Sequence, residues 1–238
     1  MLKRLRRIGQ GLVSVLYPSR CPICRRIVDG AENAVCSVCE DQLPKTTANG
    51  AECQTAQTRQ ISFASFIVAP FYYEGALRDA VLRYKFQSVR SYAPVFAAYA
   101  AEAVRRAVRD GSLTMPELVT YVPVSAARLR QRGYDQARLF AEALAERLEL
   151  PFAQLIEKTT DTPPQSALDE KQRRATVIGV FMPVANSAPL AIGKRILLAD
   201  DILTTGATLA EAAKTVSYLL PEEVVCVTIA RTKQKTEK

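Results

Sequence analysis

The stretch 195–209 constrains the fold of this 238-residue chain more than any other segment. It begins with an apolar run typical of a buried strand, 196–199, which ends in the two carboxylates Asp200 and Asp201. A turn of small residues follows, and the pattern then predicts a helix over 209–220. Backbone N–H groups at a helix start bind anions. Carboxylates followed by such a turn favour a sugar phosphate, held by its ribose hydroxyls and its 5′-phosphate. An ordinary helix cap is the alternative, but a cap needs only one such polar residue.

The rest of the chain alternates between strand and helix patterns. Strands are expected at 61–73, 118–124, 152–157, 179–183 and 224–229, and helices at 75–86, 92–109 and 135–148. This alternation predicts an α/β fold with a mostly parallel sheet and flanking helices. Ligands of such sheets bind at the carboxyl ends of the strands, which places the loop 123–125 and Asp200 at one site.

Four cysteines near the N-terminus have the spacing of a zinc site. Cys21 and Cys24 form one C-x-x-C knuckle, and Cys36 and Cys39 form a second one eleven residues later. Two knuckles supply the four thiolates of a tetrahedral Zn²⁺ site, which leaves no open position and therefore predicts a structural role. Disulfides or a redox C-x-x-C are the alternatives, although the chain has no evident secretion signal and carries two knuckles.

The two remaining cysteines lie elsewhere. Cys53 sits in a polar, loop-like stretch, and three interpretations stay open for it: a spare thiol, an alternate zinc ligand or the remnant of a third knuckle. Cys226 lies in an apolar run and is expected in a buried strand.

The composition excludes several kinds of active site. The chain contains no histidine and no tryptophan. A Ser-His-Asp triad, a Cys-His pair and a histidine-bearing metal site are therefore excluded. Any general acid or base must be Asp, Glu, Lys, Tyr, Cys or the substrate itself.

Charge is concentrated at the two ends of the chain. The formal net charge is +8, and seven cationic residues precede the first acidic one. A basic end beside a zinc module favours nucleic acid or anionic lipid as a partner, and solvated charge without a partner is the alternative.

Apolar residues recur at helical spacing at the N-terminus and predict an amphipathic helix over 1–17. A zinc module with a linker follows at 18–60, then the α/β domain at 61–232 and a basic tail at 233–238. The apolar part after the charged start is broken by Gly9 and Gly11, unlike a signal peptide. We therefore expect a cytoplasmic protein. We also expect no membrane span, because no run of 18 apolar residues exists.

Residues 198–208 resemble the signature of the type I phosphoribosyltransferases, which bind 5-phosphoribosyl-1-pyrophosphate (PRPP). The resemblance implies that Asp200 and Asp201 contact the ribose 2′- and 3′-hydroxyls. It also implies that a loop holds the 5′-phosphate, and this loop consists of Thr204, Thr205, Gly206, Ala207 and Thr208.

The order of motifs along nearly the whole chain resembles the ComF family (competence protein F, also called GntX-like). The paired knuckles come first, followed by the motifs at 72–75, 131–137, 164–168 and 179–181, and then the PRPP loop. The resemblance implies a zinc finger joined to a type I phosphoribosyltransferase fold and an association with DNA uptake in natural transformation. Two features depart from the family: Asp135 stands where relatives often have Asn, and the third knuckle is reduced to Cys53.

The resemblance also implies the other half of the site. Mg²⁺-bound pyrophosphate is expected at Pro123, Val124 and Ser125. Pyrophosphate leaves C1 of the ribose through an oxocarbenium-like state. Mg²⁺ and cationic side chains must therefore neutralise the charge of the leaving pyrophosphate. Candidates for this and other catalytic roles are Asp201, Lys85, Arg132 and Arg173, together with Arg128 and Arg130. The polar loop 158–174 could close over the site.

Three functions stay open at this stage. The first is a PRPP-binding protein linked to DNA uptake. The second is an active PRPP-dependent (amido)phosphoribosyltransferase, and whether the chain is an enzyme is left undecided. The third is a non-enzymatic zinc protein that binds single-stranded DNA through its basic N-terminal module. Other DNA-uptake proteins are candidate partners.

Overall fold

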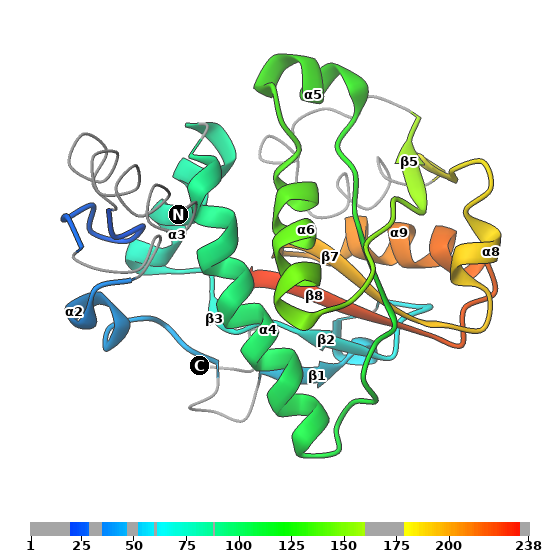
Figure 1. The fold of residues 1–238 in the computed structure, drawn as a ribbon, viewed down its shortest axis with the longest axis horizontal. Helices are drawn as coiled ribbons and strands as arrows, with labels where there is room; N and C mark the ends of the chain where they lie inside the picture. The colour runs from blue at the N-terminus through cyan, green and yellow to red at the C-terminus, as the bar shows by residue number, and fades with distance from the viewer. Residues whose placement is uncertain are drawn as a thin grey trace, which may run out of the picture.

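A central sheet organises the computed structural model, which describes residues 20–28, 35–46, 52–59, 61–87, 89–159 and 179–233. The sheet has the order β1–β2–β8–β7–β4, with β3 also paired to β8 (Figure 1). Strands β2, β8, β7 and β4 are parallel, and β1 is antiparallel to β2. The predicted α/β fold with a mostly parallel sheet is therefore confirmed. The strands of this sheet are β1 (Cys53–Thr55), β2 (Phe66–Val68), β3 (Phe71–Tyr72), β4 (Leu118–Tyr121), β7 (Arg195–Leu203) and β8 (Glu223–Arg231).

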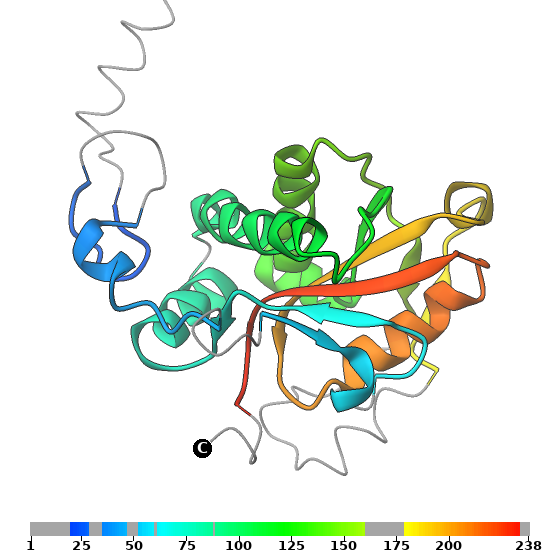
Figure 2. The same ribbon diagram turned by 90° about the horizontal axis from the view of Figure 1, so that it is seen from below.

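Helices cover both faces of the sheet. Figure 2 shows α4 and α6 on one face and α9 on the other. The alternation of side chains along β7 explains this arrangement: Leu197 and Ala199 pack in the core under α4 and α6, whereas Ile196 and Leu198 pack in the core under α9. The helices are α2 (Ser37–Glu40), α3 (Gly75–Phe86), α4 (Ala93–Arg109), α5 (Ala126–Arg132), α6 (Gln136–Leu148), α8 (Ala188–Ala191) and α9 (Ala207–Ser217), and two 3-10 turns lie at Ala56–Arg59 and Arg90–Tyr92.

Most differences from the sequence expectations concern short elements. The segment read as a linker contains β1, which exists because it pairs with the edge strand β2. The strand expected over 152–157 starts later, as β5 (Ile156–Lys158), and forms a separate antiparallel pair with β6 (Phe181–Pro183). Helix α5 was not predicted.

The cysteine module packs beside the sheet rather than on either face. Thr46 Oγ1 donates to the carbonyl of Ala69 at 2.6 Å, and Tyr72 N donates to the carbonyl of Pro44 at 2.7 Å. The helix expected over 1–17 lies outside the described residues, as do 234–238 of the basic tail. The domain boundaries stay predictions. In the described part of the chain, no helix combines the length and the apolar character needed to cross a bilayer.

Candidate functional site

A cleft of about 820 Å³ opens where β4 and β7 end, as expected for a parallel sheet. It brings together segments that are far apart in the sequence: the last turns of α3, the loop after β4, the end of α5 and the turn between β7 and α9. The sequence-predicted site residues that line it are Lys85, Pro123, Val124, Arg128, Arg132, Asp200, Asp201, Thr204, Thr205, Gly206, Ala207 and Thr208.

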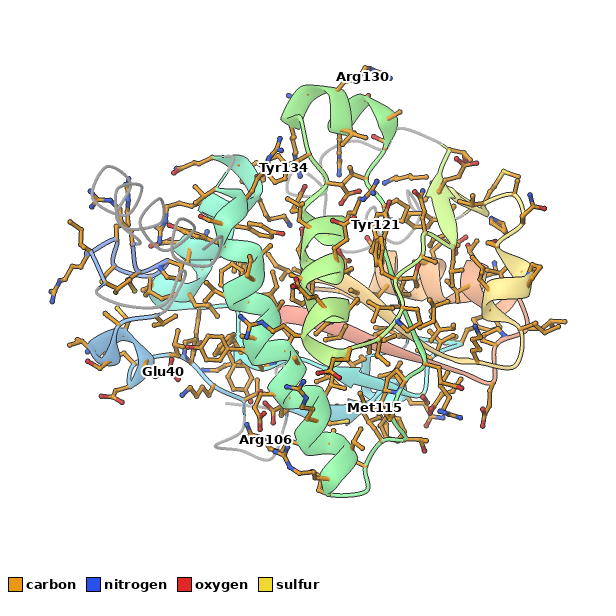
Figure 3. The ribbon with its side chains drawn as sticks, in the orientation of Figure 1. Glu40, Arg106, Met115, Tyr121, Arg130 and Tyr134 are labelled. Atoms are coloured by element: carbon orange, nitrogen blue, oxygen red, sulfur yellow. The ribbon has the colours of Figure 1, made fainter. Side chains whose placement is uncertain are left out.

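Two predicted residues do not line the cleft, and a third is not described by the structure. Ser125 is buried and caps α5, where its Oγ accepts a hydrogen bond from Arg128 N at 3.4 Å. Arg130 sits at the outer edge of α5 and points away from the molecule (Figure 3). Arg173 and most of the loop 158–174 lie outside the described residues.

The acidic pair, Asp200 and Asp201, lines the cleft near the end of β7. Asp201 is buried, and both of its carboxylate oxygens contact Lys85 Nζ, at 3.0 and 2.9 Å. Asp200 Oδ1 accepts a hydrogen bond from Asp201 N at 2.8 Å, which fixes one carboxylate against the backbone of the next residue. Lys85 therefore lies directly beside the carboxylate that is expected to contact ribose.

Burial raises the pKa of Asp200 well above its usual value, and the neighbouring charge of Asp201 raises it further. The hydrogen bond from Asp201 N and the Lys85 ammonium oppose this shift. The surroundings of Asp200 thus favour its protonated form more than water does.

We expect Asp200→Asn to raise the melting temperature at neutral pH. Because the folded-state pKa is raised, the stabilisation from the protonated form is complete below the unfolded pKa and is lost as pH rises through the folded pKa. Asparagine carries no charge at any pH and keeps an Oδ1 that accepts from Asp201 N. Thermal melts of both proteins from acidic to neutral pH check this, and a difference that does not grow with pH would contradict it.

The turn after β7 is the segment predicted to bind an anion. Gly206 has a left-handed φ of 82°, which glycine adopts without a Cβ clash, and it caps α9. Ala207 N donates to Thr205 Oγ1 at 3.4 Å. A hydrogen bond from the residue after β8 also holds the turn, since Thr232 Oγ1 donates to the carbonyl of Thr204 at 3.3 Å. The first residues of the eleven-residue helix α9, Ala207 and Thr208, line the cleft. N–H groups at a helix start have no partner within the helix and can bind an anion.

Asp135 fastens the opposite loop, after β4. Its Oδ2 accepts from Val124 N at 2.9 Å, and its Oδ1 accepts from Arg138 N at 3.1 Å as the cap of α6. Burial raises the pKa of this carboxyl, against the two backbone hydrogen bonds. Both contacts require acceptors, and a carboxylate supplies two where asparagine has one oxygen. Asp135 therefore holds the loop after β4 and the start of α6 together, with one carboxylate oxygen for each.

One helical turn joins four parts of the molecule, and we call residues 83–86 the α3 end turn. Arg83 Nη2 donates to the carbonyls of Pro22 and Ile23 in the first zinc knuckle, at 2.7 and 2.9 Å. The next three residues each hold a different partner: Tyr84 Oη donates to the Gln136 carbonyl at 2.6 Å, Lys85 pairs with Asp201, and Phe86 lies under Arg132.

The sequence reasoning missed several residues of the cleft. Arg78 and Leu82 line it from α3, together with Lys85 and Phe86. Their spacing of four, then three or four residues, marks one helix face and could have revealed them. Tyr73, Gln131 and Gln136 lie in the quoted motifs and Lys158 begins the polar loop, but none of the four was singled out as a site residue.

The cysteine cluster has the dimensions of a zinc site. The Sγ atoms of Cys21, Cys24, Cys36 and Cys39 all lie within 4.8 Å of one another, and those of Cys24 and Cys36 are 3.7 Å apart. Four Zn–S bonds of about 2.3 Å require Sγ–Sγ distances of about 3.8 Å. The residues thus fit Zn²⁺ and support a structural zinc. Cys53 lies on β1 outside this cluster, and Cys226 is buried in β8 as expected.

Comparison with known proteins agrees with this architecture. A family model described as a phosphoribosyl transferase domain matches residues 135–238, and one described as a double zinc ribbon domain matches residues 12–60. Competence protein F of Haemophilus influenzae is 30% identical over 223 residues, which cover 89% of this chain and 96% of that protein. This chain belongs to the ComF family.

Other members of the ComF family match shorter segments. Competence protein ComFC of Streptococcus pneumoniae is 28% identical over 163 residues, covering 68% of this chain and 67% of that protein. DNA utilization protein YhgH of Escherichia coli O157:H7 is 30% identical over 115 residues, covering 47% and 48% of the two chains. The resemblance inferred from the motifs is confirmed, and so is the pairing of a zinc ribbon with a phosphoribosyltransferase fold.

Proposed function

We propose that this ComF-family chain binds PRPP and acts in the cytoplasm in the handling of DNA taken up during transformation. The turn formed by Thr204, Thr205, Gly206, Ala207 and Thr208 holds the 5′-phosphate. Asp200 and Asp201 hold the ribose hydroxyls, and Mg²⁺-bound pyrophosphate lies near Pro123, Val124 and Ser125.

One observation carries the proposal: the phosphate turn, the acidic pair and the loop after β4 line a single cleft. Its lining also contains five cationic side chains against two carboxylates, which suits a ligand with three phosphate groups. The cationic residues are Arg78, Lys85, Arg128, Arg132 and Lys158.

A buried polar atom adds independent support. Gln136 lines the cleft and is only 1% exposed, and its Oε1 has no hydrogen-bond partner among the described residues. A buried carbonyl oxygen without a partner costs about 1–3 kcal/mol, so such groups are normally satisfied. A ligand hydroxyl or N–H group at this position would satisfy it.

The role in DNA uptake rests on the relatives, whose names describe competence and DNA utilization. The zinc ribbon adds the exposed cations Arg20, Arg25 and Arg26, which favour an anionic partner such as single-stranded DNA. Affinity for an oligonucleotide that does not fall as salt rises would rule out binding through these phosphate contacts.

The cationic lining also favours a second candidate, an active transferase. In that reaction a nitrogen nucleophile forms a bond to ribose C1, the bond from C1 to pyrophosphate oxygen breaks with its electron pair, and the nitrogen releases a proton. Mg²⁺ would neutralise the leaving group when bound, and Asp200 and Asp201 are oxygen ligands of the kind that it prefers. Lys85 and Arg132 would stabilise the pyrophosphate charge.

Isothermal titration with PRPP and Mg²⁺ tests the binding, and pyrophosphate release with ammonia or amines tests the turnover. We expect PRPP to bind more tightly than ribose 5-phosphate, since only PRPP fills both halves of the cleft. Binding without release would favour the non-catalytic role. Absence of binding to PRPP, ribose 5-phosphate and pyrophosphate would overturn the proposal.

A further inference from the structure

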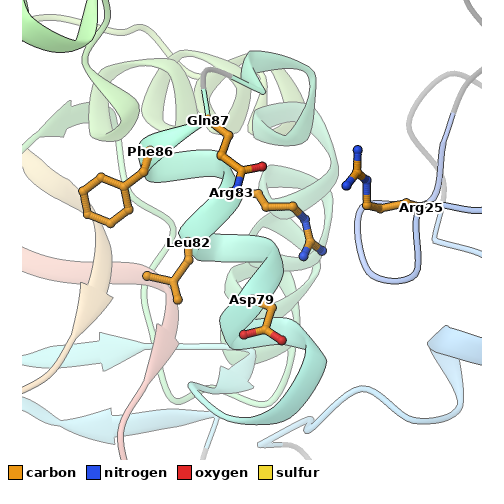
Figure 4. A pocket seen from close by; sticks show the side chains of 6 residues that line it. All are labelled: Arg25, Asp79, Leu82, Arg83, Phe86 and Gln87. Carbon is orange, nitrogen blue, oxygen red and sulfur yellow. The ribbon is translucent and has the colours of Figure 1, made fainter.

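An exposed aromatic ring stands at the mouth of the cleft. Phe86, the last residue of α3, is 62% exposed, whereas large apolar side chains are normally covered. Among the large apolar side chains that are exposed in the described residues, it is the one that lines the cleft. It also borders a second cavity, of about 430 Å³, between α3 and the zinc ribbon (Figure 4).

The ring is held in place from across the cleft. The guanidinium carbon of Arg132, at the end of α5, lies 4.8 Å from the centroid of the Phe86 ring. A guanidinium over an aromatic face is attractive and fixes the orientation of the ring. The two side chains belong to different helices and both line the cleft, so they form a flat, cationic wall at its mouth.

This wall stands next to the candidate ribose site. Lys85, the residue before Phe86, places its ammonium group 2.9 Å from Asp201. Figure 4 shows Phe86 and Leu82 projecting from one side of α3, while Arg83 projects from the other side towards Arg25. Phe86 and Leu82 therefore line the cleft together with Arg78 and Lys85, whereas Arg83 contacts the zinc ribbon.

We propose that Phe86 and Arg132 form a stacking platform for a nucleobase attached to a ribose 5-phosphate in the cleft. The assignment rests on the proposed function, because the sugar phosphate must occupy the acidic pair and the phosphate turn. Planar heteroaromatic rings stack on aromatic and guanidinium faces irrespective of the base, whereas ammonia or an alkyl amine gains nothing from such a wall. The base belongs to a free mononucleotide or to the end of a nucleic acid strand.

The test compares ligands with and without a base in the full zinc-loaded chain. Calorimetry gives the dissociation constants of ribose 5-phosphate and adenosine 5′-monophosphate for the wild-type protein, for Phe86→Ala and for Tyr218→Ala. Tyr218 is a matched control, since it is also 62% exposed but caps the far end of α9. In the wild type and the control, the base is expected to tighten binding about tenfold, the size of one base–aromatic stack. In Phe86→Ala this gain disappears and ribose 5-phosphate binds as before.

A second variant separates this proposal from the function on which it rests. The chain has no tryptophan, so Phe86→Trp places the single tryptophan at the platform, where its fluorescence can be excited selectively, at a wavelength too long for tyrosine. Quenching by adenosine 5′-monophosphate but not by ribose 5-phosphate supports the platform. If quenching is absent while calorimetry still finds ribose 5-phosphate binding, the platform fails and the proposed function stands. Quenching by a 5′-phosphorylated adenosine hexaribonucleotide alone assigns the base to a nucleic acid strand. The platform is ruled out if neither base-containing ligand quenches the fluorescence. It is also ruled out if adenosine 5′-monophosphate still binds Phe86→Ala about tenfold more tightly than ribose 5-phosphate does.

Discussion

Cys39→Ala is expected to abolish stoichiometric zinc binding and to unfold the ribbon around residues 20–46. Cys39 is one of four thiols within 4.8 Å of one another, and three thiolates cannot complete the tetrahedral site. A module this small has little core of its own, and metal binding contributes apparent free energies of about 10–16 kcal/mol in comparable zinc modules. The contacts from Arg83 to the knuckle carbonyls would be lost with it.

Zinc content by atomic absorption and limited proteolysis of the ribbon measure this effect. Cys53→Ser is the matched control, because Cys53 is half-buried on β1 outside the cluster. We expect one zinc ion per chain in the wild type and in Cys53→Ser, and substantially less in Cys39→Ala. Equal zinc content in all three proteins would show that the four-cysteine assignment is wrong.

The second large effect is expected at Asp201. Asp201→Asn should weaken PRPP binding about 10- to 100-fold, because a hydrogen bond from a ribose hydroxyl to a charged acceptor contributes about 1.5–3 kcal/mol. The same substitution removes the partner of Lys85, which is largely buried. A loss of stability could therefore accompany the loss of affinity.

Thr205→Ala keeps that ion pair and separates the two effects. It removes the hydroxyl that accepts from Ala207 N in the phosphate turn, and it should weaken PRPP binding by several-fold with little change in melting temperature. Asp79→Asn, an exposed carboxylate on α3, is the charge-matched control. Unchanged PRPP affinity in both Asp201→Asn and Thr205→Ala would refute the assignment of the sugar-phosphate site.

Long elements with a clear period could be predicted from the sequence. The helix 75–86 was found at its observed bounds, and 92–109 and 135–148 each began one residue early. The buried strands β7 and β8 were detected as apolar runs but shorter than they are, because β7 continues through the charged pair Asp200 and Asp201. An apolar run reveals the buried middle of a strand. It does not reveal a polar end, such as that of β7, which is part of the strand because of its backbone hydrogen bonds to the neighbouring strand.

Elements that depend on tertiary contacts could not be predicted. Strand β1 has only three residues, in a polar stretch of the sequence. They form a strand because they pair with β2. Helix α5 has no buried residue, so it shows no apolar period, and the caps Ser125 and Gly133 define its ends instead. Sequence reasoning therefore found the arginines of this segment but not which of them face the cleft.

The candidate site was predictable where its residues are neighbours in the sequence. Only two residues separate the acidic pair from the phosphate turn. The loop 123–125 could be placed by the rule for parallel sheets. The pairing of Lys85 with Asp201 joins residues 116 positions apart, and nothing local signals it. The contact between Phe86 and Arg132 was hidden for the same reason.

All four contacts of the α3 end turn depend on the number of residues in helix α3. Consecutive helical residues point about 100° apart, so four successive side chains sweep all around the axis and reach four different partners. Inserting or deleting one residue upstream would rotate every one of them off its partner at once. Single substitutions there release one contact each, but a change of register would disconnect the zinc knuckle, the acidic pair and both neighbouring helices together.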